Sequence, residues 1–123
     1  MAFMEPNTQN INEVLKKLLE AIPEVKAAAI ISRSGFIIAS TFSQGVYEMG
    51  VGGMTVAFFY LAERVVMEMR KGEFDQILVK GTEGYIIVTQ AGFDALLITS
   101  LSDIRGIFFD VNGICKKIAQ LLG

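Results

Sequence analysis

The sequence has no histidine, no tryptophan and one cysteine among its 123 residues. Because imidazole is the usual general base near neutral pH, its absence excludes mechanisms that depend on it. The single thiol, Cys115, excludes a disulfide within the chain, and the usual zinc sites are excluded as well. Basic residues are also few, with 11 lysines and arginines against 13 acidic residues, so we expect no nucleic-acid partner.

Long apolar runs are absent too, although 52% of the residues are hydrophobic and the mean hydropathy is +0.48. The longest uncharged runs, residues 34–47 and 49–62, have 14 residues each, whereas a bilayer span needs about 20. The first residues contain neither a basic region nor an apolar stretch, so no secretory signal is predicted. We therefore expect a soluble cytoplasmic domain that does not insert into a membrane and whose apolar excess is covered by a partner.

The first part of the chain predicts a helix and a β-hairpin. Residues 1–8 are expected to form a flexible tail. Apolar residues then recur with helical spacing over residues 9–22, and Pro23 ends the pattern. Two apolar runs, residues 25–31 and 36–40, flank a Ser-Gly turn and are typical of a hairpin.

The rest of the chain predicts a long helix, three strands and a final helix. The long helix extends over residues 47–71 and is apolar over most of its circumference, so it must be covered on more than one side. Strands are expected at residues 74–80, 85–91 and 95–100, joined by tight turns that contain glycine. The final helix is expected at about residues 103–122.

This order of elements, α-β-β-α-β-β-β-α, predicts an α/β fold in which a five-stranded antiparallel sheet has helices on both faces. The order of the strands within the sheet stays open. The length suits one domain, which we place at residues 9–123.

Motifs for catalysis or nucleotide binding are incomplete. Residues 45–50 have the glycine spacing of a phosphate-binding loop but lack the Lys-Ser/Thr that must follow. Cys115 falls on the apolar stripe of the final helix without a base to activate it, so we predict a buried, inert thiol. Glu73 and Asp75 share a strand face and are interpreted as a solvated strand start. We therefore expect no enzyme, no cofactor and no metal site.

Two features near the hairpin invite a structural interpretation. Gly50, Gly52 and Gly53 at the start of the long helix predict a close approach of another backbone. Arg33 is a lone cation beside the hairpin turn. It could contact a phosphate or a partner, although a solvated hairpin tip is the more ordinary role.

With its elements in this order, the sequence resembles the Roadblock/dynein light chain family over residues 11–122. The resemblance implies an α/β sandwich of the profilin-like or longin-like kind. The stretches that carry it are Ile-Pro-Glu-Val at 22–25, Ser-Arg-Ser-Gly-Phe-Ile-Ile-Ala-Ser at 32–40, Gln-Ile-Leu-Val-Lys-Gly at 76–81, Gly-Tyr-Ile-Ile-Val at 84–88 and Ala-Leu-Leu-Ile at 95–98.

The resemblance also implies a homodimer, in which the long helix and the strand after it pair with their copies in a second subunit. This agrees with the uncovered apolar side of that helix and with the need to protect an edge strand over residues 74–80. The interface residues implied are Val51, Met54, Phe58, Leu61, Val65, Phe74, Gln76 and Leu78.

Members of the family are non-enzymatic platforms for Ras-like small GTPases, and some of them stimulate GTP hydrolysis. The GTPase commonly binds on the face formed by the paired middle helices. The resemblance therefore implies GTPase-binding positions at Tyr60, Glu63, Arg64, Met67 and Glu68.

Two other functions stay open at this stage. One is a small-molecule sensor with a pocket between sheet and helix, suggested by Phe42, Phe58, Phe59, Phe108 and Phe109. The other is a structural subunit of a larger scaffold or motor complex.

Overall fold

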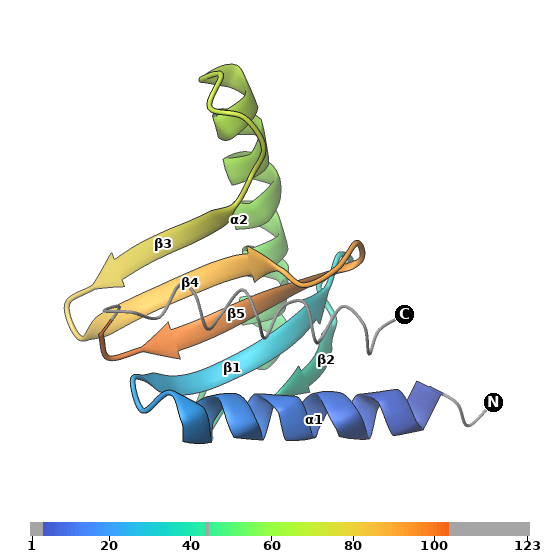
Figure 1. The fold of residues 1–123 in the computed structure, drawn as a ribbon. Coiled ribbons are helices and arrows are strands. Elements are labelled where there is room, and N and C mark those ends of the chain that lie inside the picture. Colours follow the sequence, from blue (N-terminus) through green and yellow to red (C-terminus); the bar gives the residue numbers. More distant parts are fainter. Residues whose placement is uncertain (1–3, 44, 104–123) are drawn as a thin grey trace.

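The structure is a computed structural model that describes residues 4–43 and 45–103, with side chains from residue 10 onward. Five strands form one antiparallel sheet in the order β2-β1-β5-β4-β3 (Figure 1), which confirms the predicted sheet and adds the strand order. The elements are α1 (Met4–Ala21), β1 (Val25–Ser32), β2 (Ile37–Ser40), α2 (Glu48–Glu68), β3 (Gln76–Gly81), β4 (Gly84–Gln90) and β5 (Ala95–Leu101).

The two helices cover opposite faces of the sheet. Successive residues of a strand point to opposite faces, and the neighbours of β1 show which helix lies on each. Ile30 belongs to one buried cluster with Leu15 and Leu18 of α1. Ile31 belongs to a second buried cluster with Phe59 of α2. Figure 1 shows the same arrangement, so the predicted placement of helices on both faces is confirmed.

α2 passes close to the turn of the β1–β2 hairpin. Gly35 in that turn has a φ of +94°, and a Cβ added at Gly52 would overlap the carbonyl oxygen of Gly35. The predicted close approach is therefore confirmed at Gly52. The backbone of Gly53 also approaches the turn, since a Cβ added at Gly35 would lie 3.5 Å from its Cα, although a Cβ added at Gly53 itself would meet nothing within 4 Å. At Gly50 an added Cβ would meet the ring of Tyr47.

The start of α1 differs from the prediction. The helix begins at Met4, so the prediction of a tail over residues 1–8 is wrong from Met4 onward. Pro6 lies in the first turn, where a backbone N–H has no partner within the helix, so proline is tolerated there.

The predicted final helix at residues 103–122 falls outside the described residues, together with Cys115, Phe108 and Phe109. The placement of a single domain over residues 9–123 stays a prediction.

Candidate protein-binding surface

α2 is attached to the sheet along one narrow side. Its buried residues are Gly52, Thr55 and Phe59. The hydroxyl of Thr55 donates a hydrogen bond to the carbonyl oxygen of Val51 at 2.7 Å, so its burial leaves the hydroxyl paired. Phe59 is fully buried and meets the ring of Phe74 edge-on, with 5.1 Å between the ring centroids. These contacts fix the helix where it crosses the sheet near the start of β3.

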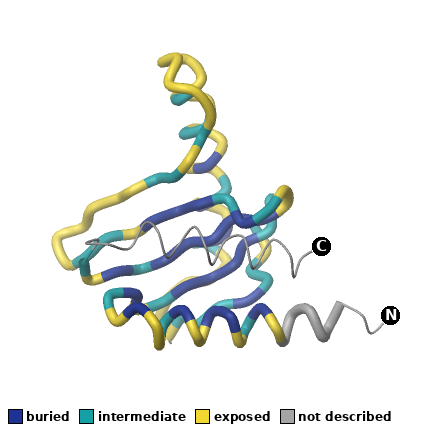
Figure 2. The backbone as a smooth tube through the Cα atoms, viewed as in Figure 1, coloured by how far each residue is buried: buried dark blue, intermediate teal, exposed yellow. Residues whose placement is uncertain are grey.

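The opposite side of α2 carries an exposed apolar stripe. Met54, Phe58, Leu61 and Val65 follow one another at helical spacing and are exposed by 56%, 49%, 65% and 57%. Figures 1 and 2 show the last turns of α2 extending past β3, largely exposed. All four residues were predicted for a dimer interface, and the fifth predicted residue of the helix, Val51, is half-buried against the sheet. A stripe of this kind marks an interaction surface.

By length and apolar composition, α2 is also the one described helix that could cross a membrane, and 17% of its most apolar window is buried. A single helix of this kind is weak evidence for a membrane span. Phe59 packs α2 against the sheet, and the charged residues Glu63 and Arg64 interrupt the apolar surface of the helix. We therefore interpret the exposed stripe as a surface for protein contact.

β3 is an edge strand, since within the described part of the chain it pairs with β4 alone. Val79 lies opposite Ile86, and both side chains are about 40% exposed on the face that α2 covers elsewhere. Of the predicted interface residues on this side, Leu78 is exposed on the other face, while Phe74 and Gln76 are half-buried. The strand thus offers unpaired backbone groups beside an open apolar patch.

A hollow of about 340 Å³ lies between the sheet and the segment that leads into α2. Apolar side chains dominate its lining, which includes Phe42, Val46, Val51, Ile86 and Ile98. Among the described phenylalanines predicted for a sensor pocket, Phe42 alone lines it. Because Ile86 also borders the exposed patch, the hollow opens on the part of the sheet that α2 leaves uncovered.

The predicted GTPase-binding residues lie on α2 outside the apolar stripe. Tyr60 and Met67 are 48% and 65% exposed, Arg64 and Glu68 are exposed, and Glu63 is half-buried. Glu63 and Met67 also line a second hollow, of about 360 Å³, beside the loop that leads to β3. This part of the helix therefore offers a mixture of charged and apolar groups.

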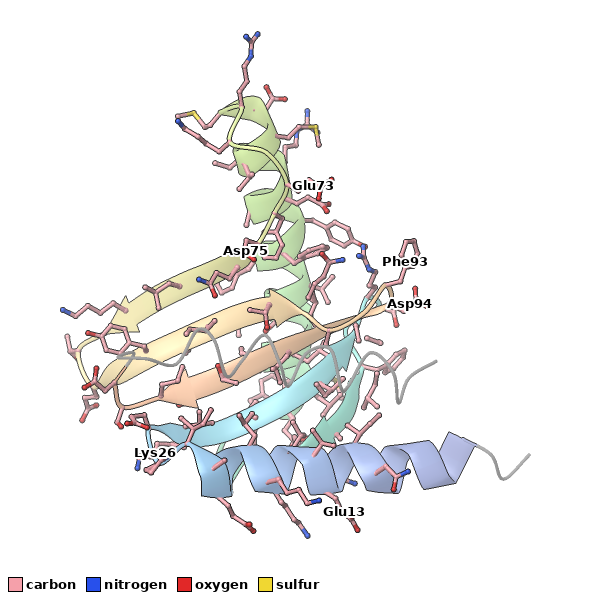
Figure 3. The ribbon with its side chains drawn as sticks, viewed as in Figure 1. Glu13, Lys26, Glu73, Asp75, Phe93 and Asp94 are labelled. Carbon is pink, nitrogen blue, oxygen red and sulfur yellow. The ribbon has the colours of Figure 1, made fainter. Side chains whose placement is uncertain are left out.

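Acidic residues do not gather into a metal site in the part of the chain that the structure describes. Glu73 and Asp75 lie exposed just before β3 (Figure 3). Among the described residues, they do not form a group of three possible metal ligands with any other acidic residue or thiol. This placement agrees with a solvated strand start.

Arg33 has a role that the sequence did not reveal. Its guanidinium carbon lies 4.9 Å from the ring centroid of Phe59 and 5.6 Å from that of Phe93. Its Nε donates a hydrogen bond to the carbonyl oxygen of Phe93 at 2.6 Å, and its backbone N–H donates to that of Asp94 at 3.1 Å. Arg33 therefore joins the hairpin turn to the β4–β5 turn and is more than a solvated tip.

The same end of the molecule carries an aromatic residue that the sequence analysis missed. Phe93 is 85% exposed at the tip of the β4–β5 turn, beside Asp94 (Figure 3). A large apolar side chain between Gly92 and Asp94, in a turn that polar residues usually occupy, was the available signal.

Comparison with known proteins gives a consistent result. A sequence model of the Roadblock/LC7 domain matches residues 11–100. Two uncharacterized proteins of Methanocaldococcus jannaschii, MJ0310 and MJ1340, are each 30% identical over 74 residues. Those residues make up 60% of this chain, and the match spans 65% of the length of either relative.

Solved structures show the same fold at lower identity. A structure described as MglB with tetrameric arrangement has a TM-score of 0.84 at 16% identity, covering 94% of this chain and 89% of that one. A Roadblock/LC7 domain from Streptomyces avermitilis has a TM-score of 0.81 at 14% identity, with coverages of 90% and 96%. A profilin in the LokiProfilin1/rabbit actin complex has a TM-score of 0.60 at 18% identity, with coverages of 92% and 96%. The predicted profilin-like architecture is thus confirmed.

Proposed function

The chain belongs to the Roadblock/LC7 domain family, whose members are regulatory or scaffold proteins, and we propose that it forms a homodimer that binds and regulates a Ras-like small GTPase in the cytoplasm. In this proposal the protein supplies a binding platform and no catalytic residue.

One observation supports the proposed dimer: the described protomer leaves three parts near the edge of β3 uncovered. They are the free edge of β3, the turns of α2 that extend past this edge, and the open patch at Val79 and Ile86. A two-fold axis beside β3 would pair the two β3 strands antiparallel. The same rotation would bring the protruding turns of each α2 toward the open patch of the other sheet. One two-fold rotation would therefore cover the edge of β3, the protruding turns of α2 and the open patch.

In this arrangement, the apolar stripes of the two α2 helices run side by side. Met54, Phe58, Leu61 and Val65 would contact the partner helix, with Val51 nearer the hollow. Phe74, Gln76 and Leu78 would lie along the paired strands. The hollow of about 340 Å³ opens on the same patch, which favours a partner helix over a small molecule as its cover. The tetrameric arrangement described for MglB supports self-association in this fold.

The GTPase would bind across the paired helices. Tyr60, Arg64 and Met67 are exposed outside the stripe, so they would stay accessible after the dimer forms. Glu63 and Glu68 add negative charge beside them. Aromatic, arginine and methionine side chains are enriched in protein interfaces, which suits these positions to the recognition of a folded partner.

Light scattering coupled to size-exclusion chromatography tests the dimer, over a dilution series from micromolar concentrations downward. We expect a mass of twice 13.5 kDa for the wild type and a monomer for Phe58→Glu. Phe36→Glu is the matched control, because Phe36 is 73% exposed and lies outside the stripe. A monomeric wild type, or a folded Phe58→Glu variant that stays dimeric, would overturn the proposed interface.

The GTPase partner is tested separately, with purified Ras-like GTPases of the same genome loaded with GDP or with a non-hydrolysable GTP analogue. We expect nucleotide-dependent binding that Tyr60→Ala and Arg64→Glu weaken. Hydrolysis rates measured with and without the protein then distinguish stimulation from scaffolding. Binding of no GTPase would leave the structural-subunit function as the better interpretation.

A further inference from the structure

Arg33, in the hairpin turn, is held in a fixed position by contacts from two other parts of the chain. Phe59 of α2 and Phe93 of the β4–β5 turn lie against its guanidinium group, at 4.9 Å and 5.6 Å from the ring centroids. The carbonyl oxygen of Phe93 accepts a hydrogen bond from Nε at 2.6 Å. An arginine held this way loses little further side-chain freedom when it binds a ligand.

The terminal nitrogens of Arg33 have no hydrogen-bond acceptor among residues 4–43 and 45–103. The neighbouring Asp94 accepts a bond from the Arg33 backbone through its carbonyl oxygen, and its carboxylate makes no ion pair with the guanidinium in that part of the chain. Since Arg33 is half-buried rather than buried, we infer that its planar pair of terminal N–H donors is available to an external acceptor.

Apolar groups flank this donor pair. Phe93, whose ring the guanidinium contacts, is 85% exposed. The ring of Phe59, which the guanidinium also contacts, lies 5.2 Å from that of Tyr60, which is 48% exposed. Arginine and aromatic residues packed together are the composition of interface hot spots. The group formed by Arg33, Phe93 and Tyr60 is called the Arg33 surface below.

The charge of the Arg33 surface favours a carboxylate over a phosphate as its ligand. Arg33 is the one cation of this surface, Asp94 lies beside it, and the whole chain has a net charge of −2. A doubly charged phosphate would meet too little positive charge here, whereas a carboxylate matches one guanidinium in charge and in bidentate geometry. The flanking rings suit an apolar side chain next to that carboxylate.

We propose that the Arg33 surface is a docking site for a partner protein that inserts an aspartate or glutamate side chain beside an apolar one. The site is complete within one protomer and lies outside the stripe of the proposed dimer. It therefore does not depend on the dimer, and although it shares Tyr60 with the proposed GTPase-binding positions, Arg33 and Phe93 belong to this site alone.

NMR titration of the ¹⁵N-labelled protein tests this proposal with two acetylated and amidated peptides, Ser-Leu-Glu-Phe-Ser and its glutamine counterpart Ser-Leu-Gln-Phe-Ser. We expect the Glu peptide to shift the Arg33 Nε–H signal and the amide signals of Phe93 and Asp94. The Gln peptide should bind at least about fivefold more weakly, because it cannot form a charge-assisted bidentate pair.

Single-residue variants distinguish a loss of peptide binding from a loss of stability. Arg33→Gln should abolish binding of the Glu peptide. Arg33→Lys should bind this peptide more weakly than the wild type, since lysine keeps the charge but lacks the planar guanidinium group. Phe93→Ser should weaken binding without changing the thermal unfolding, because Phe93 is largely exposed. Lys16→Gln on the exposed side of α1 is the control and should bind as the wild type does.

Three results would overturn the proposal. The first is equal binding of the two peptides. The second is a set of shifts that lies away from Arg33 and Phe93, or an affinity for the Glu peptide that is unchanged in Phe93→Ser. The third is inorganic phosphate displacing the Glu peptide at equal concentration, which would show a simple anion site.

Discussion

The two described helices cover the same sheet but differ in what they leave outside. α1 buries Ile11, Leu15 and Leu18 almost completely and directs charged residues such as Lys16 and Lys17 to solvent. α2 buries three residues and exposes an apolar stripe on its opposite side. The sheet covers the apolar side of α1, whereas it leaves the apolar stripe of α2 exposed. Part of the apolar excess of the composition is thus exposed on the side of α2 where we propose that a partner binds.

The largest effect is expected in α1. Leu15→Ala should lower the free energy of unfolding by about 2–5 kcal/mol, because it removes a fully buried side chain. Urea denaturation at a fixed, low protein concentration measures this loss. Leu61→Ala makes the same change on the exposed stripe of α2, and under those conditions it should cost less than about 1 kcal/mol. Equal losses would remove the distinction between the two helices.

The next effect concerns the attachment of α2 to the sheet. Gly52→Ala should cost about 1–3 kcal/mol, because the added methyl group overlaps the carbonyl oxygen of Gly35. Gly53→Ala adds the same group where nothing lies within 4 Å, and should stabilise the helix by about 0.5–1 kcal/mol. Thermal unfolding of the pair checks the opposite signs. Two changes of the same sign would contradict the described contact.

The third prediction concerns how the stability of the protein depends on its concentration. If the stripe is covered by a second copy, a tenfold increase in protein concentration should raise the stability of the wild type by about 1.4 kcal/mol per dimer. Its unfolding temperature should rise accordingly. Phe58→Glu should show no such dependence. Calorimetry over two decades of concentration makes this measurement, and a wild-type unfolding temperature that does not move would argue against the dimer.

The smallest effect on stability is expected on the exposed residues outside the stripe. Arg64→Glu should change the free energy of unfolding by less than about 0.5 kcal/mol, yet weaken GTPase binding about tenfold through reversal of a contact charge. Lys16→Glu on α1 is the matched charge reversal and should leave binding unchanged. Biolayer interferometry with the GTP-analogue complex compares the two variants, and equal loss in both would point to a general charge effect.

Local sequence patterns predicted most of the fold. The 3.6-residue period of α1 and the apolar runs beside glycine turns define their own elements, because both depend on neighbouring residues. The start of α1 was missed because Pro6 is unfavourable inside a helix but tolerated in its first turn. The strand order could not be read, since β1 pairs with a strand that lies far along the chain.

The candidate site was predicted in part for the same reason. The stripe of α2 follows helical spacing, so Met54 and Phe58 could be grouped from sequence. Arg33 was interpreted as a solvated tip because its contacts, Phe59 and Phe93, are distant in sequence and come together through the fold. The interface and GTPase-binding roles of the α2 residues stay predictions.

The strand order has a consequence for how the chain folds as it is synthesised. β1 lies between β2 and β5, and its pairing with β5 extends from Val25 opposite Leu101 to Ser32 opposite Ala95. The β1–β2 hairpin emerges from the ribosome with one open side and keeps it until almost the whole described chain has been translated. Such long-range pairing gives a high contact order and slow folding. A nascent chain of this protein therefore exposes the aggregation-prone edge of β1 during synthesis, in addition to the edges of β2 and β3 that stay open in the described protomer.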